Sequence, residues 1–496
     1  MVGHPLVFWI QFCGRYSGDG VMSESSYRPV TFKIVSVLKQ VCGESFVYYD
    51  DESKLEKYSR DKLPKQFGHM PEVVVLPKTA QEIAQIVKLA NREMIPITPR
   101  AAGSGLSGGA VPIYGGILLS SERMNNILEV DDQNLMAVVE PGVVTNKLDE
   151  VLQSHGLFFA GYPMSEEFCF IGGNVSTNAG GGRAVKYGVT GQYIKGLEMV
   201  TPTGEIIQLG GKRIKDVTGY NMVQLMVGSE GTLGIFTRIF IKLLPRPTVR
   251  QAILVLFRDP ETAISVVSEV MTSGKLVPSS IEFMDGFTFT LTAKALKETF
   301  PYEKIGAALL FEVDGNNLSV VSENATTILR ICRELGALEE YLACTDKEIE
   351  RFWRIRKRIP WDMMRYASHY SIEDIVVPIA TIPLVLSNLK RIGEKFGIAI
   401  PVLGHAGDGN LHAVPLKNTE ISEEHWKEIL PILLKEIYVM TAKLGGTISG
   451  EHGIGHKRKD YMRHVMSAAH LDMMRKIKRA LDPKNILNPG KVFNLV

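Results

Sequence analysis

Apolar residues in the first half of the chain follow helical spacing first and strand spacing next. Thr79 and Glu82 form a capping box, and the apolar residues from Ile83 to Ala90 recur every three to four positions. Ile95 to Thr98 then has the apolar character of a short strand, and a glycine-rich loop follows it. The pattern therefore predicts a helix, a strand and a glycine loop, in that order.

The pattern changes after Pro245-Arg246-Pro247, which we interpret as a domain boundary. Asp259 has the character of an N-cap, with Pro260 at the first position of the helix that follows. The remaining pattern predicts strands at Gln251–Phe257, Ala307–Val313, Glu373–Val377 and Ala399–Leu403, and a helix at Thr381–Phe396. Mixed elements of this kind indicate an α+β domain.

The first glycine loop matches the dinucleotide fingerprint G-x-G-x-x-G at Gly103, Gly105 and Gly108. That fingerprint has to follow a strand and open a helix. Here Pro112, a two-glycine turn and a short apolar strand come next, so no helix begins. Successive unhindered backbone N–H groups still make an anion nest. The loop is therefore predicted to bind a pyrophosphate without belonging to a nicotinamide site.

Two further glycine-rich segments occur at Ile171–Gly188 and Gly228–Ile235, together with the tripeptide Glu140–Gly142. The first of them is small-sided and rich in Asn, Ser and Thr, which suits close backbone approach to a flat ligand. The second opens a strand whose alternate residues from Ile235 to Leu243 are expected on one face. Each motif is weak alone, but three in one domain favour a large bound cofactor.

Near the C-terminus, GHAGDGNLH (Gly404–His412) and SGEHGIG (Ser449–Gly455) set histidines and a carboxylate among glycines. The Asp-Gly step in the first motif predicts a two-residue hairpin, which would place His405 directly opposite His412. With Glu451 as a third ligand this makes a divalent-metal site, and His452 has the parity to face a substrate. The alternative is that these are ordinary polar loop residues.

His456 and His464, further along the same region, carry no such pattern, and we interpret both as surface residues.

The composition bounds the class of protein. With 496 residues the chain predicts two or three domains, and a net charge of +2 with dispersed basic residues gives no sign of a nucleic-acid surface. No segment approaches the roughly 20 apolar residues of a membrane-spanning helix. The five cysteines are scattered, without a C-x-x-C pair, which favours a reducing compartment and argues against an iron–sulfur cluster.

The first residues are apolar but lack a basic leader and a small-residue cleavage site. We interpret Met1 to Val21 as a disordered or mis-assigned extension, with Met22 as a plausible start. A weak membrane anchor is the alternative.

The chain resembles the FAD-linked D-lactate and glycolate dehydrogenases of the vanillyl-alcohol-oxidase superfamily. The resemblance runs from about Pro71 to the C-terminus and rests on PRAAGSGLSGGAVP, IGGNVSTNAGGG, GSEGTLGI, GHAGDGNLH, SGEHGIG and LDPKNILNPGK. It implies an α+β fold: a PCMH-type FAD-binding domain of two α+β subdomains, a cap with an antiparallel sheet, and a C-terminal segment returning to the FAD domain. The expected boundaries are 1–28 for a disordered extension, 29–248, 249–445 and 446–496.

The same resemblance implies the site residues. The loop Arg100–Gly109 would bind the pyrophosphate, Gly172–Gly181 would face the flavin, and Glu230 and Ile235 would lie on the adenine side. The full set of implied FAD contacts is Arg100, Ala101, Gly103, Ser104, Gly105, Leu106, Ser107, Gly108, Pro141, Gly142, Gly172, Gly173, Asn174, Thr177, Asn178, Gly180, Gly181, Gly188, Glu230, Ile235 and Asn488. The FAD is expected to be non-covalent, because Arg100–Pro112 contains neither His nor Cys and Cys169 is read as a buried, inert thiol.

For the chemistry, the resemblance implies His405, His412 and Glu451 as ligands of a divalent metal (Zn, Mn or Fe). It implies His452 as the base and Arg356 as the residue that binds the substrate carboxylate. The alternative for Arg356 is a solvated basic helix face. Relatives that take a second carboxylate have polar groups where this chain has Pro360, Ile372 and Val414. A small monocarboxylate is therefore the expected substrate.

The hypothesis is an FAD-dependent dehydrogenase for D-lactate or glycolate. Its electrons would pass to an electron-transferring flavoprotein, an iron–sulfur subunit, a cytochrome or quinone. The expected location is cytoplasmic, with peripheral attachment at the inner face of the membrane as an alternative, and a homodimer is possible. Two rival functions stay open: a metal-dependent hydrolase without flavin, and an electron-transfer subunit whose substrate site is vestigial.

Overall fold

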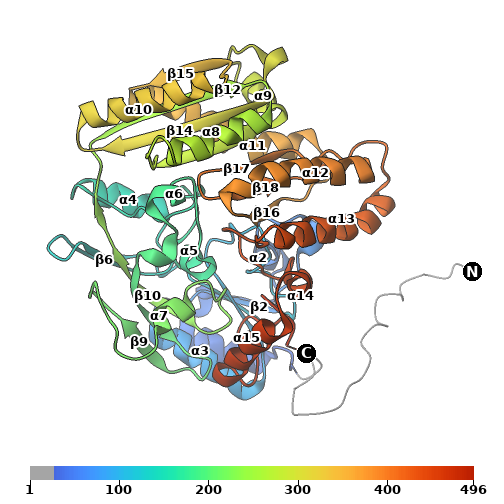
Figure 1. Ribbon diagram of the computed structural model, residues 1–496. Helices are drawn as coiled ribbons and strands as arrows, with labels where there is room; N and C mark the ends of the chain where they lie inside the picture. The colour runs from blue at the N-terminus through green and yellow to red at the C-terminus, as the bar shows by residue number, and fades with distance from the viewer. Residues whose placement is uncertain (1–26, 496) are drawn as a thin grey trace, which may run out of the picture.

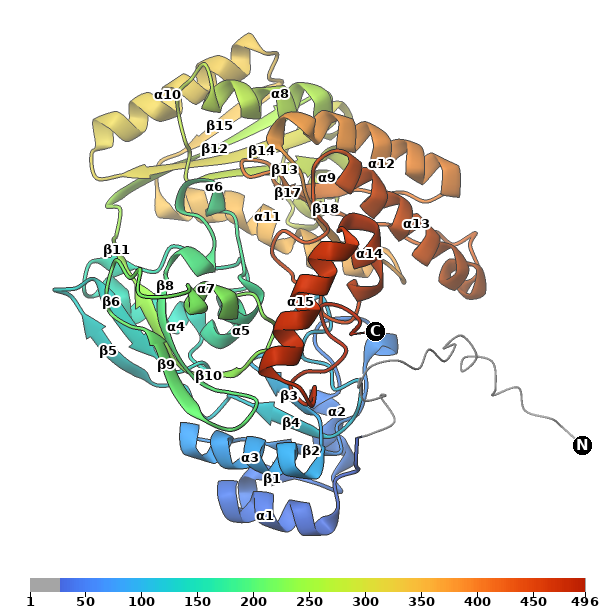
Figure 2. The same cartoon turned by 60° about the horizontal axis from the view of Figure 1, so that its bottom comes forward.

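The computed structural model describes residues 27–495, and Figures 1 and 2 show its arrangement. The predicted extension at residues 1–28, including Met22, therefore lies almost wholly outside the described residues. Two smaller sheets occupy one side of the molecule and one large sheet the other, with helices on their faces (Figure 1). The predicted α+β class is confirmed.

The first small sheet has the strand order β1-β2-β4-β3, in which β2, β4 and β3 are parallel. Its strands are β1 (Val47–Tyr48), β2 (Val73–Val75), β3 (Ile97–Arg100) and β4 (Ile117–Ser120), and the helices of this part are α1 (Phe32–Cys42), α2 (Glu52–Tyr58) and α3 (Ala80–Glu93). The predicted helix is confirmed as α3. Thr79 caps it by accepting from the Glu82 N–H, whereas Glu82 accepts from the N–H of Lys78, so the reciprocal half of the capping box is displaced by one residue.

The second small sheet is antiparallel, in the order β5-β6-β10-β8-β9. Its strands are β5 (Ile127–Asp131), β6 (Met136–Val139), β8 (Ile194–Val200), β9 (Ile206–Gly210) and β10 (Ile235–Lys242), accompanied by β7 (Leu157–Phe158), β11 (Leu244–Pro245), α4 (Thr145–Gln153), α5 (Ile171–Thr177), α6 (Ala184–Tyr187) and α7 (Met222–Met226). The strand predicted from Ile235 is confirmed as β10. Both of its faces are covered, so Phe236 and Phe240 are buried as well as the alternate set.

The large sheet has seven antiparallel strands in the order β15-β12-β14-β13-β17-β18-β16. Its strands are β12 (Val249–Phe257), β13 (Ser280–Asp285), β14 (Ala307–Gly315), β15 (Glu339–Ala343), β16 (Glu373–Val376), β17 (Val402–His405) and β18 (Asn410–Ala413). The helices α8 (Pro260–Met271), α10 (Leu318–Glu334), α12 (Ile382–Phe396) and α13 (Glu423–Lys443) pack on one face, and α9 (Gly286–Ala295) and α11 (Asp346–Tyr366) on the other.

Alternate residues of β12 supply the two cores, because side chains along a strand point to opposite faces. Ile253, Val255 and Phe257 join the first core, and Leu254 and Leu256 join the second. The predicted helix with the Asp259 cap is confirmed as α8. Two predicted strands are displaced toward the C-terminus: the one expected at Ile95–Thr98 runs from Ile97 to Arg100, and the one expected at Ala399–Leu403 starts at Val402.

The last part of the chain, α14 (Met462–Val465) and α15 (Ala468–Leu481), returns to the first small sheet (red in Figure 2). There the N–H of Ile97 donates to the Ile486 carbonyl at 2.7 Å, and the N–H of Asn488 donates to the Ile97 carbonyl at 2.7 Å. Among the described residues, no helix is both long and apolar enough to cross a membrane.

Candidate active site

The first histidine motif forms the β17-β18 hairpin as predicted, but its register differs. His405 lies opposite Asn410, and His412 lies opposite Leu403, so the predicted direct pairing of the two histidines is wrong. The reason is a four-residue connection in place of a two-residue turn: the side chain of Asp408 accepts from the Asn410 N–H, and Gly409 takes a φ of 85°. The histidines are diagonal neighbours on the same face of the sheet. Their ring centroids are 5.7 Å apart, so they still meet.

The second motif is a loop after α13 that folds back over this hairpin. Its anchor is Asp374 of β16, whose Oδ2 accepts from the Ser449 hydroxyl at 2.7 Å and from the N–H groups of Glu451 at 3.0 Å and His452 at 2.7 Å. Three hydrogen bonds to one carboxylate oxygen fix the loop, because bonds to a charged acceptor are strong. Glu451 and His452 are thereby placed beside His412.

His405, His412 and Glu451 come together as a set of three ligand atoms. Glu451 Oε1 lies 3.5 Å from His405 Nε2 and 3.2 Å from His412 Nε2. Metal–ligand bonds of about 2.0–2.2 Å in a tetrahedral site put the ligand atoms about 3.3–3.6 Å apart. Both Nε2 atoms are buried and have no hydrogen-bond partner. The residues therefore fit a divalent cation.

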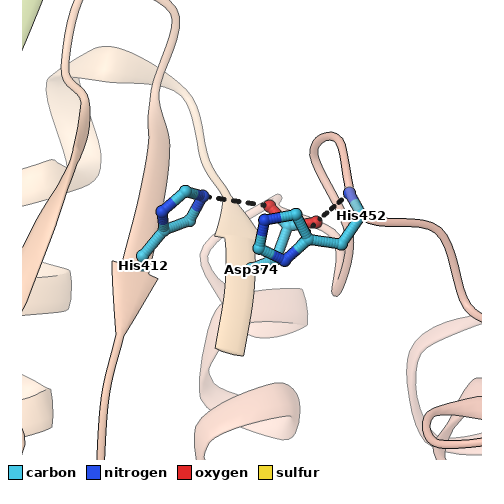
Figure 3. A group of neighbouring side chains, drawn as sticks. All are labelled: Asp374, His412 and His452. Carbon is cyan, nitrogen blue, oxygen red and sulfur yellow. Dashed lines mark hydrogen bonds and ion pairs between the residues drawn. The ribbon is translucent and has the colours of Figure 1, made fainter. Parts of the chain in front are cut away.

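A second set, Asp374, His412 and His452, also lies within reach of one point (Figure 3). The distances from Asp374 to His412 Nε2 and to His452 Nδ1 are both 3.8 Å. However, Asp374 Oδ1 already accepts from the side chain of Asn410 at 2.8 Å, and Oδ2 holds the loop. With its oxygens occupied, Asp374 is the anchor of the loop, and the set with Glu451 suits a metal better.

Electrostatics agree with a charged cluster. Burial lowers the pKa of His405, but the Glu282 and Glu451 carboxylates outweigh it and raise that pKa well above its usual value. Burial raises the pKa of Glu451, yet the neighbouring histidines hold it well below the usual value. His412 has a lowered pKa, mainly because of burial. Glu451 is thus kept negatively charged and His412 is kept neutral, as ligands of a cation would be.

Arg356 lies on α11 and is 2% exposed, so the alternative of a solvated basic face is wrong for this residue. Its Nε forms an ion pair with Glu282 Oε2 at 2.7 Å, and neither Nε nor Nη2 has a hydrogen-bond partner. Pro360, one turn later, has no N–H to donate to the Arg356 carbonyl. Lys357 and Arg358 instead pair with Glu166 and Asp362 and are more exposed.

Glu282 is a site residue that the sequence interpretation missed. It is fully buried, and its Oε1 lies 2.6 Å from His405 Nδ1. The signal was present: a carboxylate between Ile281 and Phe283, at a core position of an apolar strand, is costly unless it is paired.

A pocket of about 450 Å³ joins these residues to the glycine segments. Of the predicted residues, those that line it are Arg100, Ala101, Gly103, Ser104, Gly105, Leu106, Ser107, Pro141, Gly172, Gly173, Asn174, Thr177, Glu230, Ile235, Arg356, His412, Glu451 and His452. A long ligand along the glycine segments would therefore end beside the histidine cluster.

The other predicted FAD contacts do not line the pocket: Gly108, Gly142, Asn178, Gly180, Gly181, Gly188 and Asn488. Several of them lie where two backbone segments pack closely against each other. A β-carbon on Gly142 would be 2.2 Å from the Ser121 carbonyl, and one on Gly181 would be 2.4 Å from the Tyr162 carbonyl. Glu230 lines the pocket, but its carboxylate accepts from the N–H groups of Ile454 and Gly455. The direct role of these residues toward FAD stays a prediction.

Three predictions about single residues can be compared with the structure. The surface interpretation of His456 is wrong, because its ring packs against Gly108 of the first glycine loop and burial lowers its pKa to about 4. His464 is only partly exposed, on α14. Cys169 lines the pocket and is buried, and burial raises the pKa of its thiol, as an inert cysteine requires.

Comparison with known proteins identifies the family. The family model for the FAD binding domain matches residues 71–210, and the model for the C-terminal domain of FAD linked oxidases matches residues 246–492. The chain is 38% identical to the glycolate oxidase subunit GlcD of Bacillus subtilis, over 94% of this chain and 97% of that protein. The chain belongs to the FAD-linked oxidases.

A second relative and a solved structure support the same assignment of family and fold. The FAD-linked oxidase described here is 34% identical to a D-lactate dehydrogenase of Anaerostipes hadrus, over 95% of this chain and 99% of that protein. A solved structure of p-cresol methylhydroxylase with substrate bound has a TM-score of 0.75 at 19% identity, covering 93% of this chain and 97% of that one, which shows a shared fold. The protein is thus an FAD-linked oxidoreductase of the glycolate oxidase subunit and D-lactate dehydrogenase type, and the predicted enzyme class is confirmed.

Proposed function

We propose that the protein oxidises a small D-2-hydroxy monocarboxylate, D-lactate or glycolate, to the corresponding 2-oxo acid. The observation that carries this proposal is a convergence of buried polar atoms without hydrogen-bond partners. They are Arg356 Nη2, His405 Nε2, His412 Nε2 and His452 Nδ1. Buried polar groups are nearly always paired, so four orphaned atoms in one cluster indicate ligands that complete them.

The chain fits the two groups that this reaction needs. A β-carbon on Gly105 would meet only Asp61, at 3.5 Å, and one on Gly173 only Ala101, at 3.2 Å. Both glycines therefore leave bare backbone toward the pocket, as non-covalent FAD binding requires. His405, His412 and Glu451 would hold the divalent cation. When bound, FAD supplies the two-electron acceptor, and the cation lowers the pKa of the substrate hydroxyl.

Arg356 and His452 have separate roles in the reaction, one toward the substrate carboxylate and one toward the hydroxyl proton. Oxidation removes a hydride from the substrate carbon and a proton from its hydroxyl. Arg356 binds the carboxylate, and because the guanidinium is buried, its planar fork orients the substrate strongly. His452 takes the proton, since its Nδ1 has no hydrogen-bond partner, with the nearest oxygen of Asp374 at 3.8 Å. General-base assistance of this kind contributes about 10²–10⁴-fold to the rate.

The wall beyond the histidines is apolar, which favours a monocarboxylate. In the register of β16 and β18, Asp374 lies opposite His412, so Ile372 and Val414 lie two residues further on the same face, roughly 7 Å away. Pro360, one helical turn from Arg356, lines the same space. A second carboxylate there would lose its hydration without gaining a partner. D-2-Hydroxyglutarate should therefore be used at least about 100-fold less efficiently than D-lactate, judged by kcat/KM.

A visible spectrum of the purified protein tests the proposal. Anaerobic D-lactate or glycolate should bleach the flavin bands, and prior treatment with a chelator should prevent bleaching while the colour remains. A yellow protein that is bleached by neither acid would instead be an electron-transfer subunit with a vestigial substrate site. The alternative of a flavin-free hydrolase is excluded by the family.

The electrons then have to leave the protein. The four cysteines among the described residues, Cys42, Cys169, Cys332 and Cys344, are all free, and no two of them are closer than 12 residues in the sequence. Thiolate clusters need grouped cysteines. We therefore propose that the acceptor is an electron-transferring flavoprotein, an iron–sulfur subunit, a cytochrome or quinone.

A further inference from the structure

One buried carboxylate, Glu282, contacts both halves of the proposed site. It lies on β13, where it is the direct cross-strand neighbour of His405. Its Oε1 is 2.6 Å from His405 Nδ1 and accepts from the Ser280 hydroxyl at 3.2 Å. Its Oε2 is 2.7 Å from Nε of Arg356, on the helix α11 that covers this face of the sheet. One side chain thus touches a residue of the metal set and the residue that binds the substrate carboxylate.

We propose that Glu282 is a positioning residue that holds His405 and Arg356 in register with each other. This inference rests on the proposed function, because it assigns Glu282 to the metal and the carboxylate of that reaction. A fully buried carboxylate is destabilising unless it is paired on every side. Oε1 of Glu282 has hydrogen-bond partners in His405 and Ser280, whereas Oε2 is neutralised by the ion pair with Arg356 without a hydrogen bond, so these contacts explain its place in the core.

The contact with His405 decides which ring nitrogen is free. The ionised Glu282 can only accept, so Nδ1 keeps its hydrogen. A metal that displaced the second proton of the imidazolium would therefore find the lone pair on Nε2, which faces Glu451. A metal-binding histidine needs this arrangement, and a carboxylate behind the ring also strengthens it as a ligand. Without Glu282, no carboxylate behind the ring would fix which nitrogen of His405 carries the hydrogen.

The contact with Arg356 positions the part of the site that would bind the substrate carboxylate. The ion pair at Nε, 2.7 Å from Glu282 Oε2, keeps the guanidinium beside Glu282, while neither Nε nor Nη2 has a hydrogen-bond partner in the protein. A carboxylate of the substrate would meet a fork that is already oriented, so little side-chain entropy is lost on binding. The distance between metal and carboxylate sites is thereby set by one rigid side chain.

The flavin-side glycine segment covers this carboxylate. A β-carbon on Gly182 would lie 2.8 Å from Glu282 Oε1, and Gly182 takes an ordinary φ. Gly182→Ala therefore displaces Glu282 while keeping its charge. This gives a second way to move the carboxylate that leaves neither His405 nor Arg356 without a counter-charge.

The experiment compares Glu282→Gln with a matched control, Glu312→Gln. Glu312 is 1% exposed on the adjacent strand β14, opposite Ser280 in the register. It pairs with Arg183 and Trp353 and forms no hydrogen bond or ion pair with His405 or Arg356. Each FAD-loaded protein is stripped of metal with a chelator and titrated with Zn²⁺ and with Mn²⁺ by calorimetry. Glu282→Gln should bind the metal about 10–100-fold more weakly, because it removes the carboxylate behind a ligand histidine. Glu312→Gln should stay within twofold of the parent.

A second measurement uses D-lactate on the metal-saturated proteins. Glu282→Gln should lower kcat/KM about 100-fold, mostly through KM, because Arg356 is no longer held in place. If Glu282→Gln fails to retain FAD, Gly182→Ala replaces it and should weaken metal binding in the same direction by about three- to tenfold.

The outcomes separate the inference from the function. Metal affinity and KM that are unchanged in Glu282→Gln, or unchanged in Gly182→Ala where that variant stands in, overturn the role of Glu282. A parent protein that binds no metal and is not bleached by D-lactate overturns the proposed function instead. Equal weakening in Glu312→Gln shows a general effect of buried charge on the sheet, which also overturns a specific role for Glu282.

Discussion

At the scale of single residues, the site is made of buried charges whose partners come from distant parts of the sequence. Glu451 contacts His405 and His412 across the hairpin, and Glu282 contacts His405 from the neighbouring strand. Removing one member of such a cluster leaves the others buried and unpaired, which costs more than the lost contact itself.

We expect His412→Ala to lose metal while keeping FAD, because it removes one of three ligands and leaves the glycine segments that would bind FAD unchanged. Changes behind a ligand already weaken metal binding about 10–100-fold, so loss of a ligand should weaken it by more than about 100-fold. His425→Ala is the control, since His425 is exposed on α13. Elemental analysis that finds equal metal in parent and His412→Ala would place the ion elsewhere.

His456 gives a prediction about pH. Burial lowers its pKa to about 4 in the folded protein, against an unfolded value near 6.5. Between these values the unfolded chain binds a proton that the folded protein does not, so this stability is present above pH 6.5 and lost as the pH falls to 4. The loss is at most about 1.4 kcal/mol per pH unit. His456→Phe keeps a ring against Gly108 and should therefore show a shallower fall of Tm between pH 6.5 and 4.5.

The thermal midpoints are measured on FAD-loaded parent and variant at several pH values. Parallel curves for the two proteins would mean that His456 does not contribute to the acid sensitivity.

Residue identities could be predicted better than residue partners. The ligand types and the hairpin followed from the motifs, because glycine, Asp-Gly and histidine have local meanings. The register did not, because whether a turn has two or four residues depends on contacts such as that of Asp408 with Asn410. Glu282 was missed because its partners, His405 and Arg356, lie more than seventy residues away in the chain.

At the scale of elements, the glycine segments have two functions that the structure separates. Gly142 and Gly181 permit backbone to approach backbone, since a β-carbon on either would overlap a carbonyl oxygen. Gly105 and Gly173 instead line the pocket, where a β-carbon on either would meet one side chain and no backbone. The sequence predicted the segments but not this division, because spacing alone does not show what lies opposite each glycine.

We expect Gly105→Val and Gly173→Val to fold and to lose FAD, because their side chains would fill space that the cofactor needs. Gly315→Val is a matched control: its β-carbon would meet Val321 at 3.3 Å, close to the 3.2 Å for Gly173, but it lies on β14 outside the pocket lining. The ratio of flavin to protein absorbance after gel filtration checks this. Variants at Gly105 and Gly173 that remain fully yellow contradict the assignment of these loops to FAD.

In the large sheet, the pattern predicted the strands β12, β14, β16 and β17 and the helices α8 and α12, since their periods are regular and the cap Asp259 marks the start of α8. It did not predict β13, β15, α9, α10, α11 or α13. The helix α5 was not predicted, although it lies within the second glycine segment. Its residues are poor helix formers, so tertiary contacts hold it: Asn174 donates to the Thr145 hydroxyl, and Gly172 fits against Pro141.

At the scale of the whole molecule, the C-terminal segment joins parts of the chain that are far apart in sequence. The side chain of Asn488 donates to the carbonyls of Gly109, at 2.9 Å, and Glu230, at 2.7 Å. Glu230 in turn accepts from the loop that carries His452. The glycine loops and the histidine loop are thus connected through one buried side-chain amide and one carboxylate. The return of the C-terminal segment was predicted by the resemblance to a known family and not by any local pattern in the sequence.

Asn488→Asp tests that connection with almost no change of shape. The substitution replaces a donor by a carboxylate oxygen that faces two carbonyls, so buried acceptors are left unpaired at a cost of about 1–3 kcal/mol or more. Aspartate also tolerates the φ of 42° at this position, so backbone strain does not contribute. We expect a lower Tm and faster release of FAD on dilution. Asn388→Asp, at an exposed amide on α12, should change neither. If the Asn488 variant keeps both the parent Tm and the parent FAD release rate, the bonds to Gly109 and Glu230 do not hold the cofactor loops together, and the C-terminal segment serves only to cover the first sheet.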